Sequence, residues 1–285
     1  MKEHVGIFSI EKMAKTLGVS RSGYYAFLLE KRSKREEEDG ALLKEIKELY
    51  LGSHQIFGSR KITKEINKRR EQSVNHKRVE RLMKEQQLYS KVTPKYKVTT
   101  NSQHLLPLAE DLLKRDFTAR RPNEKWVSDT TYLWTGEGWL YVAAILDLYG
   151  RKVVGLATSS KNDRFLTIEA LLDAKGRVGK SHMRGCISHS DRGSTYAANE
   201  YVEALAACHM QQSMSRKGNC WDNAPMESFW GKMKLEWFDG YCDTRREAIQ
   251  LVYEYAFSFY NNHRPHATNG YLTPTEYYAR PAAAA

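Results

Sequence analysis

The chain has 285 residues, of which 41% are hydrophobic, and its 45 Lys and Arg against 34 Asp and Glu give a net charge of +11 at pH 7. The length leaves room for about two domains with packed cores. No run of about 18 apolar residues occurs, the first residues lack the apolar stretch of a secretory signal, and the four cysteines form no C-x-x-C pair. A membrane-spanning protein, a secreted disulfide framework and a zinc site are therefore not expected.

The positive charge is concentrated in the first part of the chain. Residues 1–125 carry 28 Lys and Arg against 17 Asp and Glu, whereas residues 126–285 carry 17 of each kind. A basic arm beside a neutral domain is typical of a protein that handles a polyanion such as DNA. An acidic membrane surface is the rival partner, but the basic residues fall on several short helices and not on one long amphipathic helix.

Residues 1–38 are predicted to form a helix-turn-helix unit. Gly18 can end the first helix in a left-handed conformation, and Ser20 can cap the second. The second helix would then expose Arg21 as a candidate DNA contact. A helical hairpin with no role in DNA binding explains the spacing equally well. The apolar residues at helical spacing are Ile10, Met13, Ala14 and Leu17.

Residues 39–92 are predicted to form a second helical, basic DNA-binding unit. Within residues 51–100 there are 13 Lys and Arg against 4 Asp and Glu. Such a one-sided excess favours phosphate contacts, although cations that only solvate the surface are the alternative. The charged run 31–39 ahead of it is expected to be a solvated linker or a fraying helix. The candidate DNA contacts are Lys61, Lys77, Arg78 and Arg81.

Proline-containing residues 93–124 show little periodicity and are predicted to be a connector. In the following region, 125–240, three β-branched runs joined by short turns predict an antiparallel meander. Helices then alternate with further short strands, which is typical of an α/β fold. Residues 241–285 are predicted to add a C-terminal helix and a tail that pack on this core. The residues expected to face inward from that helix are Ile249, Val252, Tyr253, Phe257 and Tyr260.

Three carboxylates in this region are candidate catalytic residues. Asp129 lies on the first predicted strand, Asp191 follows a later one, and Glu227 falls on the first turn of a helix after a gap of 35 residues. Three such groups in one small pocket cannot all stay ionised without a cation, and Mg²⁺ takes oxygen ligands. Two ions about 3.5–4 Å apart can hold the attacking and leaving oxygens of a phosphodiester. We therefore expect a metal-dependent enzyme that cuts and joins DNA strands.

Each carboxylate also has an ordinary interpretation. Asp129 could be a polar residue at a strand edge, Asp191 an Asx turn before Gly193, and Glu227 an acid that favours the helix dipole. Taken singly, these interpretations are at least as good as catalysis. The three together favour a metal site.

Other polar residues near these positions are expected to be structural. Asp147 is interpreted as a hairpin-turn residue, Asp222 as a helix cap and His189 as a buried structural histidine. Lys234 lies on the same helix face as Glu227, seven residues later, where it can meet a DNA phosphate. The further candidate DNA contacts in the preceding glycine-containing loop are Arg216, Lys217 and Asn219.

The motifs WVSDTTY, HSDRGSTY, SRKGNCWDNAPMESFWGKMKLE and YNNHRPH resemble those of the transposases of third-group insertion sequences, the product of their second open reading frame. This family belongs to the retroviral-integrase superfamily. The resemblance implies an RNase-H-like core with a mixed five-stranded sheet and flanking helices. It also implies that Asp129, Asp191 and Glu227 bind two Mg²⁺ ions, with Mn²⁺ as a substitute, and that Lys234 contacts DNA.

The same resemblance implies the biological role. The chain would cleave the ends of an insertion sequence and transfer the 3′-hydroxyl to target DNA. Its partners would be double-stranded DNA, at least one further copy of itself and the upstream-frame product, in the bacterial cytoplasm at the nucleoid. A regulator that binds DNA without cutting it and a general RNase-H-type nuclease are the alternatives. No sustained heptad repeat occurs before residue 40.

Overall fold

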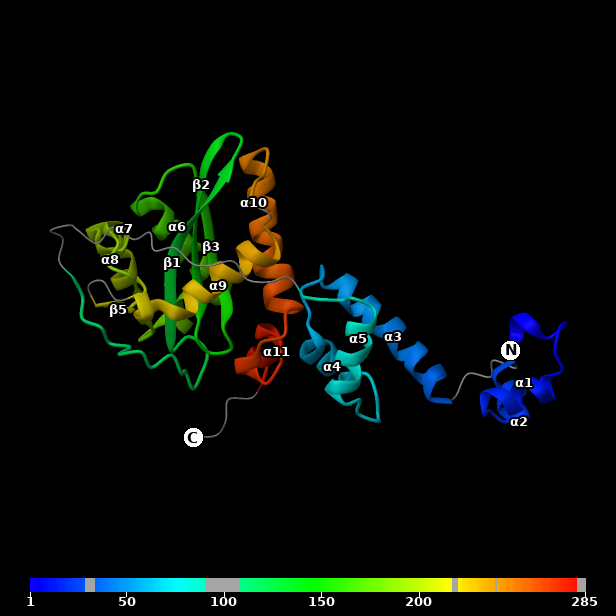
Figure 1. Cartoon of the computed structure of the whole chain (residues 1–285). Helices are drawn as coiled ribbons and strands as arrows, with labels where there is room; N and C mark the ends of the chain where they lie inside the picture. The colour runs from blue at the N-terminus through cyan, green and yellow to red at the C-terminus, as the bar shows by residue number, and fades with distance from the viewer. Residues whose placement is uncertain (29–33, 91–107, 217–219, 239, 281–285) are drawn as a thin grey trace. The chain divides into compact units, whose positions relative to one another are not determined.

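The computed structural model describes residues 1–28, 34–90, 108–216, 220–238 and 240–280. Its contacts divide the chain into two compact units, Met1–Ser90 and Lys91–Ala285 (Figure 1). The first unit is helical, and the second contains a five-stranded sheet. No helix among the described residues is long and apolar enough to cross a membrane.

Helices α1 (Ile10–Leu17) and α2 (Arg21–Leu28) form the predicted helix-turn-helix arrangement. Gly18 ends α1 with a φ of 64°, the left-handed conformation that glycine adopts without strain. The Oγ atom of Ser20 accepts a hydrogen bond from the backbone N–H of Gly23 at 3.0 Å. The expectations for Gly18 and Ser20 are therefore confirmed.

Three further helices, α3 (Lys34–Gly52), α4 (Ser59–Lys68) and α5 (His76–Glu85), pack on one another in the first unit. Their apolar faces meet in a core that contains Leu42, Ile46, Ile62, Ile66, Val79, Leu82 and Met83. Helix α3 begins at Lys34, so from that residue the charged run is helical, and the predicted boundary between residues 38 and 39 falls inside α3.

The sheet of the second unit has the strand order β3-β2-β1-β4-β5. Strands β1 (Lys125–Thr135), β2 (Gly138–Asp147) and β3 (Lys152–Ser159) form the predicted antiparallel meander. Strands β4 (Ile187–Ser190) and β5 (Gln211–Met214) extend the sheet in parallel from β1. The prediction of a mixed five-stranded sheet is confirmed.

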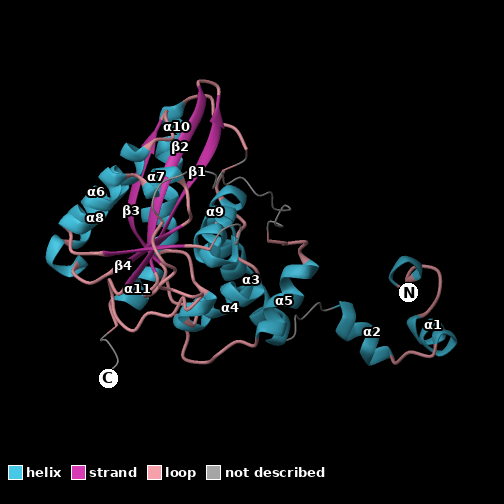
Figure 2. Ribbon diagram, turned by 90° about the vertical axis from the view of Figure 1, so that its left-hand side faces the viewer, coloured by secondary structure: helices cyan, strands magenta, loops and turns pink. Residues whose placement is uncertain are grey.

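Helices cover both faces of this sheet (Figures 1 and 2). On one face, α6 (Arg164–Val178) packs on β2 and β3, and α8 (Asn199–Ala207) packs on α6. A Cβ at Gly155 of β3 would lie 2.4 Å from the carbonyl oxygen of Ala170, so only glycine allows α6 to approach so closely. The helical segment before β5 is divided in two, because Ala198 is extended between α7 (Ser194–Ala197) and α8.

The other face is covered by α9 (Ala224–Glu236) and α10 (Arg245–Tyr253), and α11 (Pro274–Tyr278) packs against β3. The predicted C-terminal helix is not a uniform α-helix, because Glu254–Tyr260 is π-helical. Of the residues predicted to face inward, Ile249, Tyr253 and Phe257 are only half-buried, whereas Val252 and Tyr260 are buried. The buried residues of the π-helical segment are Tyr255, Ala256, Phe259 and Tyr260.

The outer edge of β3 is closed by side chains. The amide of Asn261 accepts a hydrogen bond from the backbone N–H of Val153 and donates one to its carbonyl, both at 2.9 Å. The backbone N–H of Leu156 donates to Asp173 at 3.0 Å, and the Tyr253 hydroxyl donates to the Leu156 carbonyl at 3.3 Å. These side chains take the place of a sixth strand at two positions of the edge.

Candidate active site

The parallel register of β1 and β4 brings two predicted site residues together. Val127 pairs with His189, and Asp129 and Asp191 each lie two residues further along their strands. Adjacent strands are about 4.8 Å apart, so residues separated by 62 positions in the sequence become neighbours. Helix α9 is attached to the same place, because the Asn223 side-chain amide donates to the carbonyl of Ser128 at 3.0 Å. Glu227, on the first turn of α9, therefore lies beside this end of the sheet.

The electrostatics of Asp129 show that all three carboxylates act on one another. Burial raises the pKa of Asp129 well above its usual range, and the negative charge of Asp191 and then that of Glu227 raise it further. The backbone N–H of Thr130 and the indole of Trp230 act in the opposite direction and are outweighed. The site is a cluster of carboxylates in which Asp129 is repelled by both of the others.

The side chains do not form a ready-made metal site. Across the described ranges, no group of three or more His, Cys, Asp or Glu side chains is arranged to hold an ion. Asp191 also makes the Asx turn that was its ordinary interpretation, since the backbone N–H of Gly193 donates to its Oδ1 at 2.9 Å. This hydrogen bond orients the carboxylate, and it is compatible with metal binding through the other oxygen. The donor set itself, three carboxylates, suits Mg²⁺.

His189 lies beneath this pocket as a structural residue, as expected. It is fully buried, and its Nδ1 and Nε2 atoms lie 2.8 and 3.2 Å from the hydroxyls of Ser213 and Ser215. Burial lowers the pKa of His189, which keeps the ring neutral. Both ring nitrogens are used inside the protein.

Asp222 is structural too, but not as a helix cap. Asn223 is the N-cap residue of α9, and no side chain makes a capping hydrogen bond there. Instead Asp222 accepts from Arg115 Nε at 2.8 Å and from three nitrogens of Arg216 at 3.0–3.1 Å. These arginines outweigh burial and hold the pKa of Asp222 far below its usual range. The predicted DNA contact Arg216 therefore binds Asp222, two residues before α9 begins.

Lys234 lies close to the acidic pocket, as the helical spacing predicts. Its Nζ atom is 5.2 Å from the centre of the Tyr132 ring, which is a cation–π distance. Burial lowers the pKa of Lys234, whereas the charge of Asp129 raises it. Lys217 and Asn219 lie outside the described residues.

Asp147 is buried at the end of β2, where the hairpin turn to β3 begins as predicted, and it is more than a turn residue. It accepts hydrogen bonds from the Asn123 N–H at 2.7 Å, the Tyr149 N–H at 2.9 Å and the Tyr278 hydroxyl at 2.7 Å. Burial outweighs these bonds and raises the pKa of Asp147 to about 6. Asp147 therefore joins the start of β1 and helix α11 to the sheet.

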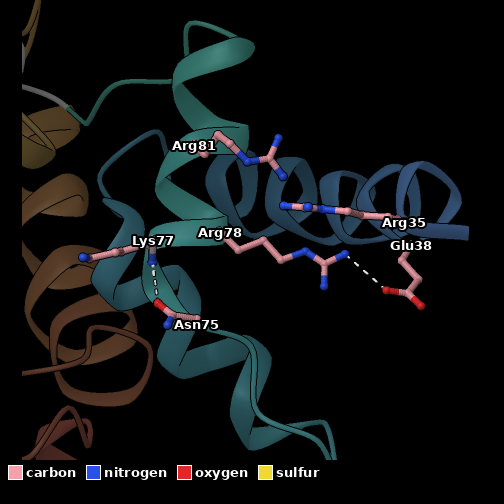
Figure 3. Close-up of a pocket in the computed structure, with 6 residues that line it drawn as sticks. All are labelled: Arg35, Glu38, Asn75, Lys77, Arg78 and Arg81. Carbon is pink, nitrogen blue, oxygen red and sulfur yellow. Dashed lines mark hydrogen bonds and ion pairs between the residues drawn. The ribbon is translucent and has the colours of Figure 1, made fainter. Parts of the chain in front are cut away.

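The candidate DNA contacts of the first unit differ in whether their charge is already paired with an acidic side chain. Arg78 and Arg81 of α5 both bind Asp39 of α3 at 2.6 Å, which sequence reasoning missed because it treated the acidic run as solvated. Figure 3 shows them with Lys77 around an open cavity of about 620 Å³. Arg21 of α2 is exposed, 3.9 Å from Glu11, and Lys61 of α4 lies 5.4 Å from the centre of the Phe57 ring. The cavity is lined by Arg35, Glu38, Asn75, Lys77, Arg78 and Arg81.

Family profiles match most of the chain. Two Integrase core domain profiles match residues 119–220 and 209–274, and an HTH-like domain profile matches residues 36–96. The HTH-like match thus covers the helices α3–α5, whereas the helix-turn-helix predicted from the spacing in residues 1–38 consists of α1 and α2.

Full-length relatives are similar to the chain. It is 41% identical over 266 residues to the insertion element IS600 uncharacterized 31 kDa protein of Shigella sonnei, which covers 93% of this chain and 97% of that protein. It is 34% identical over 284 residues to the transposase InsF for insertion sequence IS3A of Escherichia coli (strain K12), covering 97% and 96%. The HTLV-2 integrase catalytic core domain solved in complex with magnesium superposes with a TM-score of 0.42 at 14% identity, over 55% of this chain and 97% of that one.

Proposed function

The chain belongs to the insertion-sequence transposases that carry an integrase core domain, which are DDE polynucleotidyl transferases, and we propose that Asp129, Asp191 and Glu227 are its catalytic metal ligands. One observation carries this assignment: the charges of Asp191 and Glu227 both raise the pKa of the half-buried Asp129. A divalent cation relieves such repulsion, and carboxylate oxygens are the ligands that Mg²⁺ prefers, with Mn²⁺ as a substitute. The carboxylates would rotate towards the cations as these bind.

The positions of the residues suggest their roles. Asp129 feels the charges of both other carboxylates, so we assign it to both ions, with Asp191 on one and Glu227 on the other. Two bound ions would neutralise charge at the attacking and leaving oxygens of the phosphodiester. The Gly193 N–H orients Asp191, and all three carboxylates are half-buried. No covalent bond between protein and DNA is required.

DNA is the substrate, and the remaining contacts are part of the proposal. Lys234 would bind a phosphate next to the cleaved bond, because its ammonium lies within the electrostatic reach of Asp129. Lys77 and Arg21 would also bind the DNA backbone, together with Lys61, Arg78, Arg81, Arg216, Lys217 and Asn219. Two transposon ends must meet, so we propose at least a dimer on DNA, with the upstream-frame product as a further partner. The DNA of the bacterial nucleoid is the proposed place of action.

A cleavage and joining assay tests the metal-ligand assignment. Labelled insertion-sequence ends and target DNA are incubated with Mg²⁺ or Mn²⁺ and with the wild type, Asp129→Asn, Asp191→Asn or Glu227→Gln. Cleaved and joined products are expected only from the wild type and from Glu203→Gln, a control that removes an exposed carboxylate of α8. Full activity in any one of the three variants would refute its assignment.

The same assay separates the two alternatives. A regulator would bind the labelled ends without any metal-dependent product. A general nuclease would release free ends and join none of them. Joined strands are the outcome that the family predicts.

A further inference from the structure

The far end of α9 is held by a buried ion pair. Arg264 Nε donates to Glu236 Oε2 at 2.6 Å, and Arg264 Nη2 donates to Glu236 Oε1, so the pair is bidentate. Both side chains are only 6% exposed. The hydroxyl of Tyr255 donates a third hydrogen bond to Glu236 Oε2 at 3.0 Å. Glu236 is the last residue of α9, which also carries Glu227.

Helix geometry places this ion pair opposite the active-site face. An α-helix turns about 100° per residue, so the nine residues from Glu227 to Glu236 amount to two and a half turns. Lys234, seven residues after Glu227, returns to the Glu227 side. The rise of about 1.5 Å per residue puts the ion pair about 13 Å along the helix from Glu227, too far to touch the carboxylate cluster. Both side chains of the pair are buried, so Arg264 is connected to Glu227 through α9.

The π-helical segment supplies the surface against which this end of α9 packs. The ring of Tyr260 lies 4.9 Å from that of Phe229 in an edge contact, and the ring of Phe259 lies 4.7 Å from that of Trp237. π turns recur at functional sites, where they redirect side chains that an α-helix would present elsewhere. Here the π turn buries Tyr255 and directs its hydroxyl to Glu236.

Stability alone is a weak explanation for this arrangement. Moving two charges out of water costs several kcal/mol per ion, and well-packed apolar residues often stabilise a fold equally well. An apolar contact, however, tolerates sliding and rotation, whereas a bidentate pair with a third hydrogen bond fixes both. The pair therefore contributes a defined orientation of α9 more than it contributes net stability.

We propose that Arg264 and Tyr255 are positioning residues, which hold Glu236 and so fix the rotation of α9 that places Glu227 at the metal site. The inference rests on the proposed role of Glu227. It assigns a function in the DNA-cleaving reaction to residues that contact neither metal nor DNA.

The test separates orientation from stability. Arg264→Met alone leaves Glu236 as a buried, unpaired charge and is expected to lower the melting temperature. Arg264→Met combined with Glu236→Met removes both charges and is expected to restore melting close to that of the wild type. Single-turnover cleavage by the double variant, at saturating DNA, is expected to stay about 10-fold to 100-fold slow, with a higher Mg²⁺ midpoint and unchanged DNA affinity. Wild-type cleavage with a wild-type Mg²⁺ midpoint would overturn the inference.

A gentler variant covers the case in which the double variant does not fold. Tyr255→Phe keeps the ring and removes one hydrogen bond, and it is expected to raise the Mg²⁺ midpoint and slow cleavage by about 3-fold to 10-fold. An unchanged midpoint and rate would contradict the proposal. Arg246→Met, at an exposed position of α10, is the matched control. Glu227→Gln is measured in parallel: if it cleaves normally, the metal-ligand proposal fails, whereas a failure confined to the other variants refutes the positioning role alone.

Discussion

Asp129 on β1 and Asp191 just beyond the end of β4 lie at equivalent positions along two parallel strands, because each follows the Val127–His189 pair by two residues. Backbone hydrogen bonds determine this proximity, and the carboxylates themselves oppose it through their repulsion. The fold thus holds two like charges together at a cost in stability. Removing one of the two charges is therefore expected to increase stability and to decrease activity.

Asp191→Asn should lower activity and raise stability. Without Mg²⁺, loss of one negative charge beside Asp129 is expected to increase the free energy of unfolding by on the order of 1 kcal/mol. Asparagine can keep the hydrogen bond from the Gly193 N–H, so the local turn should survive. Cleavage should fall by about 100-fold or more. Denaturant unfolding and the cleavage assay check the two effects, and a destabilised variant would show that Asp191 is chiefly a turn residue.

Magnesium should stabilise the wild type more than Asp129→Asn. A ligand that binds only the folded state at about 100 times its Kd adds about 2.7 kcal/mol to the free energy of unfolding. The melting temperature of the wild type should therefore rise with Mg²⁺ concentration and return to its starting value when EDTA is added. Glu203→Gln should respond like the wild type. Equal Mg²⁺ shifts in the wild type and in Asp129→Asn would place the ion elsewhere.

Asp147 should make the stability of the second unit fall as the pH rises from about 4 to about 6. Its pKa is about 6 in the folded chain against a usual value of 3.8, so the folded state binds the proton more tightly than the unfolded state. The free energy of unfolding is then greatest below the pKa that Asp147 has in the unfolded chain. It falls by on the order of 3 kcal/mol as the pH rises past the pKa of Asp147 in the folded chain.

The groups that face Asp147 determine how the pH experiment is designed. The Tyr278 hydroxyl donates to it, and the positive charge of Lys152 and the thiol of Cys186 interact with it electrostatically. Asp147→Asn removes the titration and leaves these neighbours in place. The difference in unfolding free energy between the two proteins should therefore change across pH 4–6. A pH-independent difference would contradict the raised pKa.

Neighbouring cations on α5 should behave differently in DNA binding. Arg78→Ala removes an ion pair with Asp39 and should lower the melting temperature of the first unit as well as its DNA affinity. Lys77 has no described ion pair of its own, so Lys77→Ala should leave melting unchanged. If Lys77 binds a phosphate, the slope of log K against log salt should fall by about 0.9. An unchanged salt slope would exclude that contact.

Much of the site was predictable from local rules. The β-branched run around Asp129, the strand expected before Asp191 and the helix expected at Glu227 were each the correct element. The left-handed Gly18 and the cap Ser20 likewise follow from side-chain chemistry that acts over a few residues. Such features depend on neighbours in the sequence.

What could not be predicted depends on distant partners. Asp39 is one of several acids in a charged run, and only its contacts with Arg78 and Arg81 distinguish it. Aspartate is a common N-cap residue, and Asp222 directly precedes the N-cap position of α9. It is bound instead by Arg115, which lies more than a hundred residues earlier in the sequence. The π turn at Glu254–Tyr260 could not be predicted from apolar residues repeating every 3.6 positions, which is the α-helical period. Its buried residues are those that pack on α9, as Tyr260 does on Phe229.

The side-chain bonds along β3 have a consequence for assembly. An outermost strand with unmet backbone groups invites another chain to pair with it, which is a common origin of aggregation. With Val153 and Leu156 engaged by Asn261, Asp173 and Tyr253, a neighbouring molecule finds no template for β-augmentation at those points. Copies crowded onto one stretch of DNA are thus kept from fusing there into a continuous intermolecular sheet.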